Sequence, residues 1–196
     1  MNQFLSQEYW NNRYLQHQTG WDIGTVSTQL KEYIDQLSDK HISILIPGGG
    51  NSYEALYLLE QGFTDVTVID LAPAVTEKLK SETKSYQPHI KILTGDFFEL
   101  NGQYDLILEQ TFFCAIDPAL RGHYVTKMSE LLKPQGKLVG VLFNRSFEGG
   151  PPFGGSEAEY RTLFSSTFQQ IHMEPCYNSI NPRSGSELFV VLGDSV

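Results

Sequence analysis

Polar residues that could bind a small ligand recur where short apolar segments end. Gly48, Gly49 and Gly50 follow the first such segment, and Asp70 follows the second, about twenty residues further on. Glycines let the backbone turn tightly beneath a ligand and adopt positive φ. An acid at this spacing is suited to accept hydrogen bonds from ribose hydroxyls. The pattern indicates a nucleoside-binding site, and the alternatives are a plain glycine turn and a helix N-cap at Asp70.

Further acids narrow the choice of ligand. Glu54 lies at the start of the next predicted helix, Asp96 and Phe97 follow the third apolar segment, and Glu109 follows the fourth. A carboxylate at Glu54 would repel a pyrophosphate, yet it suits the ammonium of a methionine moiety. This favours S-adenosylmethionine over a nicotinamide cofactor, whose pyrophosphate prefers close backbone approach at a helix start. A turn residue is the alternative interpretation of Asp96.

The elements that position these residues alternate between strands and helices. Strands are predicted at Ile42–Ile46, Val66–Ile69, Ile90–Leu93, Tyr104–Leu108 and Lys137–Phe143. Helices are predicted at Asn51–Gln61, Pro73–Ser85 and Pro118–Leu132. This is the pattern of an α/β fold, a mostly parallel sheet with helices on both faces. Ligands of such sheets bind at the carboxyl ends of the strands, where the residues above fall.

The end of the chain has a different pattern. A helix predicted at Ser156–Phe164 precedes strands at Phe168–Met173 and Glu187–Leu192. The segment between these strands contains Asn181-Pro-Arg-Ser-Gly185, a turn with no room for a helix. A parallel pair would need a long crossover, so the last two strands are predicted to pair antiparallel.

Two further helices, Ser6–His17 and Thr25–Leu37, are predicted before the sheet. Their aromatic, uncharged faces are expected to pack over a ligand. We therefore predict one domain over residues 1–196, with a helical lid at residues 1–40 and a Rossmann-like core at residues 41–196.

Composition limits the partners and the location. The 196 residues suffice for one domain, and the net charge of −9 disfavours nucleic acid as a partner. Neither Cys114 nor Cys176 belongs to a metal-binding spacing, so no metal site is predicted. The chain has no apolar run long enough to span a membrane and no secretion signal at its start. We expect a cytoplasmic protein, monomeric, with a small molecule as its partner.

Several longer stretches carry a family resemblance. They are Trp10-x-x-Arg13, Thr19-Gly20-Trp21-Asp22-x-Gly24, Leu45 to Gly50, Phe112 to Arg121, Leu131 to Gly136 and Gly149 to Phe153. In these stretches the chain resembles the thiopurine S-methyltransferase-like branch of class I methyltransferases, and within it the thiol and halide methyltransferases. Gly49 stands where the family usually has Cys, and Ser52 replaces a glycine.

The resemblance implies a seven-stranded sheet with a reversed last strand. It also implies that Trp21 and the Gly48–Gly50 turn hold the methionine part of S-adenosylmethionine, that Asp70 binds the ribose, and that Asp96 and Phe97 contact the adenine. The full set of predicted cofactor residues is Trp10, Trp21, Gly48, Gly49, Gly50, Glu54, Asp70, Leu71, Asp96, Phe97 and Glu109.

The expected reaction is methyl transfer to a thiol or a halide, with S-adenosylhomocysteine as product. A thiolate or halide arrives already anionic, so no strong general base is required and no catalytic residue is predicted. The candidates for the acceptor pocket are Arg13, Phe112, Phe113, Arg121 and Phe153. Core packing is the alternative for the Phe112–Phe113 pair, and salt bridges for the arginines. The alternative functions are an N- or O-methyltransferase of another small metabolite, a cofactor-binding module without catalysis and, least favoured, a nicotinamide oxidoreductase.

Overall fold

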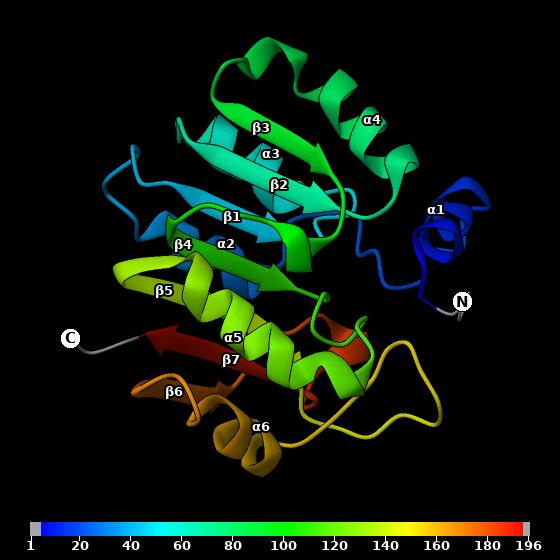
Figure 1. The fold of residues 1–196 in the computed structure, drawn as a ribbon, viewed down its shortest axis with the longest axis vertical. Coiled ribbons are helices and arrows are strands. Elements are labelled where there is room, and N and C mark those ends of the chain that lie inside the picture. The colour runs from blue at the N-terminus through cyan, green and yellow to red at the C-terminus, as the bar shows by residue number, and fades with distance from the viewer. Residues whose placement is uncertain (1–4, 194–196) are drawn as a thin grey trace.

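The computed structural model describes residues 5–193 and contains one mixed sheet (Figure 1). Its strands are β1 Ile44–Pro47, β2 Val66–Asp70, β3 Ile90–Thr94, β4 Tyr104–Gln110, β5 Leu132–Phe143, β6 Gln170–Pro175 and β7 Glu187–Gly193. The seven strands lie in the order β3-β2-β1-β4-β5-β7-β6. Strand β7 runs antiparallel to both β5 and β6, and the other pairs are parallel. The predicted seven-stranded sheet and its reversed last strand are confirmed.

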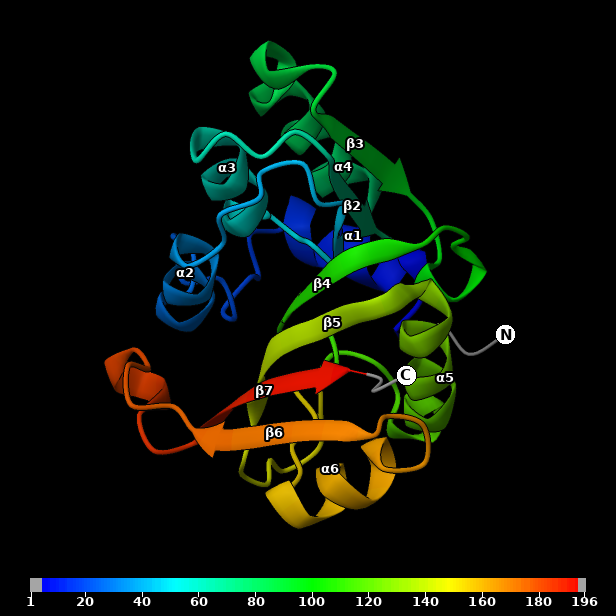
Figure 2. The same cartoon turned by 90° about the vertical axis from the view of Figure 1, so that its left-hand side faces the viewer.

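Helices cover both faces of the sheet (Figure 2). They are α1 Gln7–Leu15, α2 Thr28–Asp35, α3 Tyr53–Glu60, α4 Pro73–Glu82, α5 Arg121–Leu131 and α6 Glu157–Phe164. Short 3-10 helices occur at η1 Lys84–Tyr86, η2 Phe97–Glu99, η3 Pro118–Leu120 and η4 Asn181–Arg183. Side chains of α5 and α6 form one apolar cluster with the sheet, and those of α2 and α3 form a second. Strands β1 and β2 are buried throughout because they lie between these two layers.

Two strand boundaries differ from the predicted ones. Strand β5 begins at Leu132, five residues before the predicted start at Lys137, and its pairing with β4 is irregular there. A Cβ on Gly136 would lie 2.9 Å from the carbonyl oxygens of Lys133 and Tyr104, so only glycine fits this irregularity. Strand β6 begins at Gln170 because Phe168 still belongs to the turn that ends α6, where its N–H donates to Phe164.

The two N-terminal helices occupy different layers. Helix α1 lies beyond the carboxyl ends of β1 to β4 and has no buried residue (Figure 1). Helix α2 packs into the core, where Leu30 and Ile34 are fully buried. The structure thus differs from the expectation of a lid at residues 1–40: α2 is part of the core, and only α1 and the segment after it lie at the rim. Residues 1–4 are outside the described range.

Candidate active site

A cavity of about 430 Å³ opens at the carboxyl ends of the parallel strands. Its walls come from α1, the segment leading to α2, the turn between β1 and α3, the end of β4, the loop after β5 and the segment around η4. Small-molecule sites occupy roughly 300–1,000 Å³ and lie at this edge of open α/β sheets. The sheet therefore places a cavity of ligand size where the sequence analysis expected one.

The turn after β1 forms the floor of the cavity. Gly48 and Gly50 have φ of +57° and +54°. A Cβ on Gly48 would lie 2.2 Å from Phe112 Cδ2, and one on Gly49 would lie 2.4 Å from Val68 Cγ1. The glycines are therefore required both by backbone conformation and by close packing. Ser52, which replaces a glycine of the family pattern, also has positive φ, 50°, and lies directly before α3.

Asp70 lines the cavity and fixes the shape of this turn. Its side chain is 7% exposed, and its Oδ2 accepts a hydrogen bond of 2.8 Å from the Gly50 N–H. Its Oδ1 accepts from the Ala72 N–H, also at 2.8 Å. Burial raises the pKa of Asp70, while these hydrogen bonds act in the opposite direction. Each carboxylate oxygen has a second lone pair, so Asp70 can still accept from hydroxyls of a ligand.

Glu54 supplies a second buried carboxylate to the cavity wall. It is 7% exposed, and its Oε1 accepts from the Ser27 N–H at 3.0 Å. Burial raises the pKa of Glu54, which means that the charged form lacks the solvation it would have in water. A cationic group bound in the cavity would compensate for that loss.

Aromatic side chains of the N-terminal segment form another part of the cavity wall. Trp21 makes edge-to-face contacts with Trp10 and with Tyr14, at centroid distances of 5.7 and 5.8 Å. The guanidinium of Arg13 lies 5.5 Å from the centre of the Trp21 ring. The Tyr14 hydroxyl lies above the turn, since a Cβ on Gly50 would be 2.8 Å from it. Burial raises the pKa of Tyr14, so its phenol stays protonated.

Several predicted cofactor residues lie near the cavity without lining it. Leu71 lies between Asp70 and the start of α4. Asp96 is exposed and accepts a hydrogen bond of 2.9 Å from the Phe98 N–H, as a turn residue does. Phe97 is buried behind Phe112, with the two ring centres 5.1 Å apart. Of the predicted cofactor residues, Trp10, Trp21, Gly48, Gly49, Gly50, Glu54 and Asp70 line the cavity.

Glu109 lies beneath the cavity and holds the loop that follows β4. Its Oε1 accepts from the N–H groups of Phe112, at 2.8 Å, and Phe113, at 3.0 Å. Its Oε2 is buried without a hydrogen-bond partner. Burial raises the pKa of Glu109 to about 7. Glu109 therefore supports the cavity wall from inside the protein, and it does not face the ligand space.

The predicted acceptor residues fall into two groups, those that line the cavity and those that support its wall. Arg13 and Phe112 line the cavity. Phe113 is 1% exposed and belongs to the core, where Arg121 stacks on it at 4.5 Å from the ring centre. Arg121 donates to the Gly154 carbonyl oxygen at 2.9 Å, and the Phe153 N–H donates to Cys114 at 2.6 Å. Arg121 and Phe153 thus anchor the loop after β5, whose residues Pro151 and Pro152 do line the cavity.

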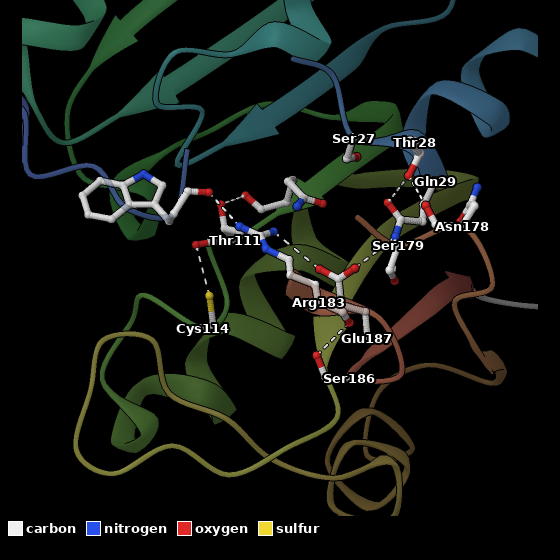
Figure 3. Close-up of polar contacts among 12 residues, drawn as sticks. Ser27, Thr28, Gln29, Thr111, Cys114, Asn178, Ser179, Arg183, Ser186 and Glu187 are labelled. Carbon is white, nitrogen blue, oxygen red and sulfur yellow. Dashed lines mark hydrogen bonds and ion pairs between the residues drawn. The ribbon is translucent and has the colours of Figure 1, made fainter. Parts of the chain in front are cut away.

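Three charged residues that line the cavity, Asp22, Arg145 and Arg183, were not among the predicted site residues. The side chain of Arg183, in η4, is 12% exposed and donates to the Trp21 carbonyl oxygen at 2.7 Å. It also pairs with Glu187 at 3.4 Å, and Glu187 in turn accepts from Gln29 at 3.0 Å (Figure 3). Trp21 and Gln29 are about 160 residues from their partners, so no local pattern could have indicated these two contacts.

The comparisons with solved structures define the fold class. The structure of 1,6-didemethyltoxoflavin-N1-methyltransferase from Burkholderia thailandensis, with bound S-adenosylhomocysteine, matches with a TM-score of 0.75. At 18% identity, the match covers 97% of this chain and 87% of that one. The fold is that of the S-adenosylmethionine-dependent methyltransferases.

The sequence comparisons give the family. The family model for thiopurine S-methyltransferase matches residues 5–187. A probable thiol methyltransferase 2 from Arabidopsis thaliana is 30% identical, over 91% of this chain and 81% of that protein. Thiocyanate methyltransferase 1 from Brassica oleracea is also 30% identical, over 86% of this chain and 77% of that protein. The chain belongs to the thiopurine S-methyltransferase family and is an S-adenosylmethionine-dependent methyltransferase.

Within residues 5–193, no group of three or more His, Cys, Asp and Glu side chains is arranged to hold a metal ion. None of the helices in that range is long and apolar enough to cross a bilayer.

Proposed function

We propose that this methyltransferase acts on a small anionic nucleophile, a thiolate or a halide. The observation that carries the proposal is a division of charge across the cavity. Glu54 and Asp70 lie on the side of β1 and β2, while Arg145 and Arg183 lie on the side of β5 and β7. The N-terminal segment adds Arg13 and Asp22, one charge of each sign. Carboxylates on one side favour a cationic ligand, and guanidinium groups on the other favour an anion.

The residues of the acidic side fit S-adenosylmethionine. The glycine turn provides a backbone surface that a Cβ would fill, Glu54 can pair with the methionine ammonium, and Asp70 can accept from the ribose hydroxyls. The aromatic faces of Trp10 and Trp21 can exclude water and stabilise a sulfonium. When bound, this cofactor supplies a methyl group on positively charged sulfur, which an aligned nucleophile can displace.

The basic side suits a nucleophile that is already charged. The Arg183 guanidinium would hold a thiolate or halide and would lower the pKa of a bound thiol. No histidine is among the described residues that line the cavity. Cys114 lines it, but burial raises the pKa of its thiol well above the usual range, so it is not available as a base. Arg183 therefore favours anionic acceptors over the neutral amines or alcohols of an N- or O-methyltransferase, which more often need a base.

The relatives fit the same acceptor class. Proteins named as a thiol methyltransferase and a thiocyanate methyltransferase are each 30% identical to this chain. A cofactor-binding module without catalysis would not need charged and aromatic groups around an open space beside its cofactor. Arg145, Phe147 and Arg183 form such a border here.

The test is release of S-adenosylhomocysteine by purified protein with S-adenosylmethionine and one acceptor at a time. The acceptors are iodide, thiocyanate, bisulfide, a thiopurine, an aryl thiol, a neutral amine and an alcohol. We expect turnover with at least one of the anionic or thiol acceptors and none with the amine or the alcohol. Turnover confined to the amine or the alcohol would overturn the proposal, and so would cofactor binding without turnover of any acceptor.

A pair of variants tests the role of the basic side. Arg183→Met removes the guanidinium and retains an unbranched apolar side chain, and we expect kcat/KM for an anionic acceptor to fall about tenfold or more. Arg161→Met is the matched control, because Arg161 lies on α6, is 45% exposed and does not line the cavity. Equal kcat/KM values for the two variants would argue against Arg183 as the acceptor-side charge.

A further inference from the structure

Helix α1 supplies cavity residues without entering the core. Trp10, Arg13 and Tyr14 all line the cavity and are half-buried, and no residue of α1 is fully buried. The helix packs mainly against α4, at the edge of the molecule (Figure 1). An amphipathic helix is usually held by an apolar stripe that faces the core, and α1 has no such stripe. Its ring contacts with Trp21 are therefore supplemented by a specific polar contact.

That contact is a hydrogen bond from the start of α4 to Asn11. The Oδ1 of Asn11 accepts from the Ala74 N–H at 2.8 Å, across 63 residues of sequence. Helix α4 has Ala72 at its N-cap position, followed by Pro73, and no side chain of its own caps it. The first N–H groups of a helix need an acceptor from elsewhere, and Asn is among the best cap residues. Asn11 supplies this cap from another helix.

The cap also joins α1 to the ribose side of the cavity. Helix α4 begins three residues after Asp70, and the Ala72 N–H donates to Asp70 Oδ1 at 2.8 Å. Asn11 and Asp70 therefore bind the same short backbone segment from two sides. A shift of this segment would move Asp70 and α1 together, which couples the N-terminal helix to the predicted cofactor site.

A second set of contacts holds the segment after α1 independently. Asp22 accepts hydrogen bonds from Asn51 and from the Tyr53 hydroxyl, and the Trp21 carbonyl accepts from Arg183. Loss of the Asn11 contact would therefore loosen α1 from α4 and leave its ring contacts with Trp21 to hold it, while Trp21 and Asp22 stay attached to the core. This separates the role of Asn11 from the folding of the cavity as a whole.

We infer that Asn11 is a positioning residue that holds α1 over the cofactor by capping α4. The inference rests on the proposed placement of S-adenosylmethionine in this cavity. Without the cap, Trp10 and Tyr14 spend more time away from the cavity, and the cofactor escapes faster. The chemical step is unaffected once the cofactor is bound and α1 is docked.

The test compares Asn11→Ala, Asn11→Asp and Asn12→Ala. Asn12 is the matched control, because it is the same residue type in the same helix and is exposed. Asp at position 11 still accepts from the Ala74 N–H, and its charge is favourable at the N-terminus of α4. Dissociation constants for S-adenosylhomocysteine are measured by calorimetry, and kcat and KM for S-adenosylmethionine by product release.

A second readout needs no ligand. The chain has two tryptophans, Trp10 and Trp21, and both line the cavity. Quenching of tryptophan fluorescence by acrylamide in the ligand-free protein therefore reports whether α1 is docked. Undocking of α1 would expose Trp10 and would also remove the ring that packs on Trp21.

We expect Asn11→Ala to raise the dissociation constant and KM for the cofactor about fivefold, the usual effect of a lost cap, with kcat unchanged. It should also increase quenching, whereas Asn11→Asp and Asn12→Ala should match wild type in both measurements. If Asn11→Ala behaves like Asn12→Ala, the inference is wrong. If wild-type protein does not bind S-adenosylhomocysteine at all, the proposed cofactor site fails instead, and the quenching comparison still decides whether Asn11 docks α1.

Discussion

Arg183 donates a hydrogen bond of 2.7 Å to the carbonyl oxygen of Trp21, which lies 162 residues earlier in the chain. The same guanidinium pairs with Glu187 at the start of β7 (Figure 3). One side chain therefore connects the aromatic wall of the cavity to β7, the reversed strand that lies between β5 and β6. Its charge and its hydrogen bonds have separable roles, because the first acts on the acceptor and the second on the position of Trp21.

Arg183→Lys should separate these roles. Lysine keeps the positive charge, but its single ammonium cannot reproduce the planar fork that binds Trp21 and Glu187 together. We expect the free energy of unfolding to fall by about 1 kcal/mol, the usual contribution of one hydrogen bond. The KM for S-adenosylmethionine should rise, while discrimination between anionic and neutral acceptors persists. Urea unfolding and steady-state kinetics measure the two effects, and a lysine variant that loses acceptor discrimination would contradict the assignment.

Gly48→Ala should disrupt the floor of the cavity. The added Cβ would lie 2.2 Å from Phe112 Cδ2, at a residue whose φ is +57°. We expect the free energy of unfolding to drop by about 2 kcal/mol and cofactor binding to weaken, because Phe112 must move. Gly122→Ala is the control: Gly122 lies in α5 with nothing within 4 Å of its Cβ position, and alanine there should stabilise by up to about 1 kcal/mol. Equal effects of the two substitutions would show that the turn tolerates a side chain.

The sequence predicted what local pattern and sheet topology determine. The alternation of apolar segments with helical patterns was sufficient to predict the parallel strands. The short link before Glu187 was sufficient to predict that the last strand is reversed. The glycine turn and Asp70 were found because strand ends converge at one edge of such a sheet. Helix α2 was assigned to a lid because an apolar stripe looks the same in the sequence whether it covers a ligand or, as Leu30 and Ile34 do, enters the core.

The remaining site residues depend on tertiary contacts. Arg183 enters the cavity because Glu187 and Trp21 orient it, and the contact with Trp21, 162 residues earlier, is not predictable from the turn in which Arg183 lies. Phe113 and Arg121 were candidates for the acceptor pocket because aromatic and cationic side chains are suited to bind an anionic acceptor. Their stacking on each other, 4.5 Å from guanidinium carbon to ring centre, places them behind the wall instead.

Glu109→Gln should change how stability depends on pH. Burial raises the pKa of Glu109 from its ordinary value of 4.5 to about 7. Between these values the folded protein retains a proton that the unfolded chain has lost, so the free energy of unfolding falls as pH rises through this window. The loss amounts to about 3 kcal/mol and is complete above the folded pKa.

Glutamine does not titrate, and its carbonyl can still accept from the Phe112 and Phe113 N–H groups. The variant should therefore lose less stability than wild type between pH 4.5 and about 7. Glu54 and Asp70 also have raised pKa values, but they contribute equally to both proteins and cancel in the difference. Urea unfolding at a series of pH values measures it. Parallel pH profiles for the two proteins would mean that Glu109 does not titrate in this range.

Gln110→Leu should raise stability and alter the choice of acceptor. Gln110 ends β4 and lines the cavity, and its Oε1 is buried without a hydrogen-bond partner. Leucine removes this buried carbonyl, which receives no hydrogen bond, so we expect the free energy of unfolding to rise by about 1 kcal/mol. Gln29→Leu is the matched control and should destabilise, because the Gln29 amide donates to Glu187 and to Ser179.

If the free Gln110 carbonyl receives a hydrogen bond from the acceptor, Gln110→Leu should lower kcat/KM for thiols that carry an N–H or O–H group and leave iodide and thiocyanate unaffected. An equal change for all acceptors, together with a higher KM for S-adenosylmethionine, would instead assign Gln110 to the cofactor.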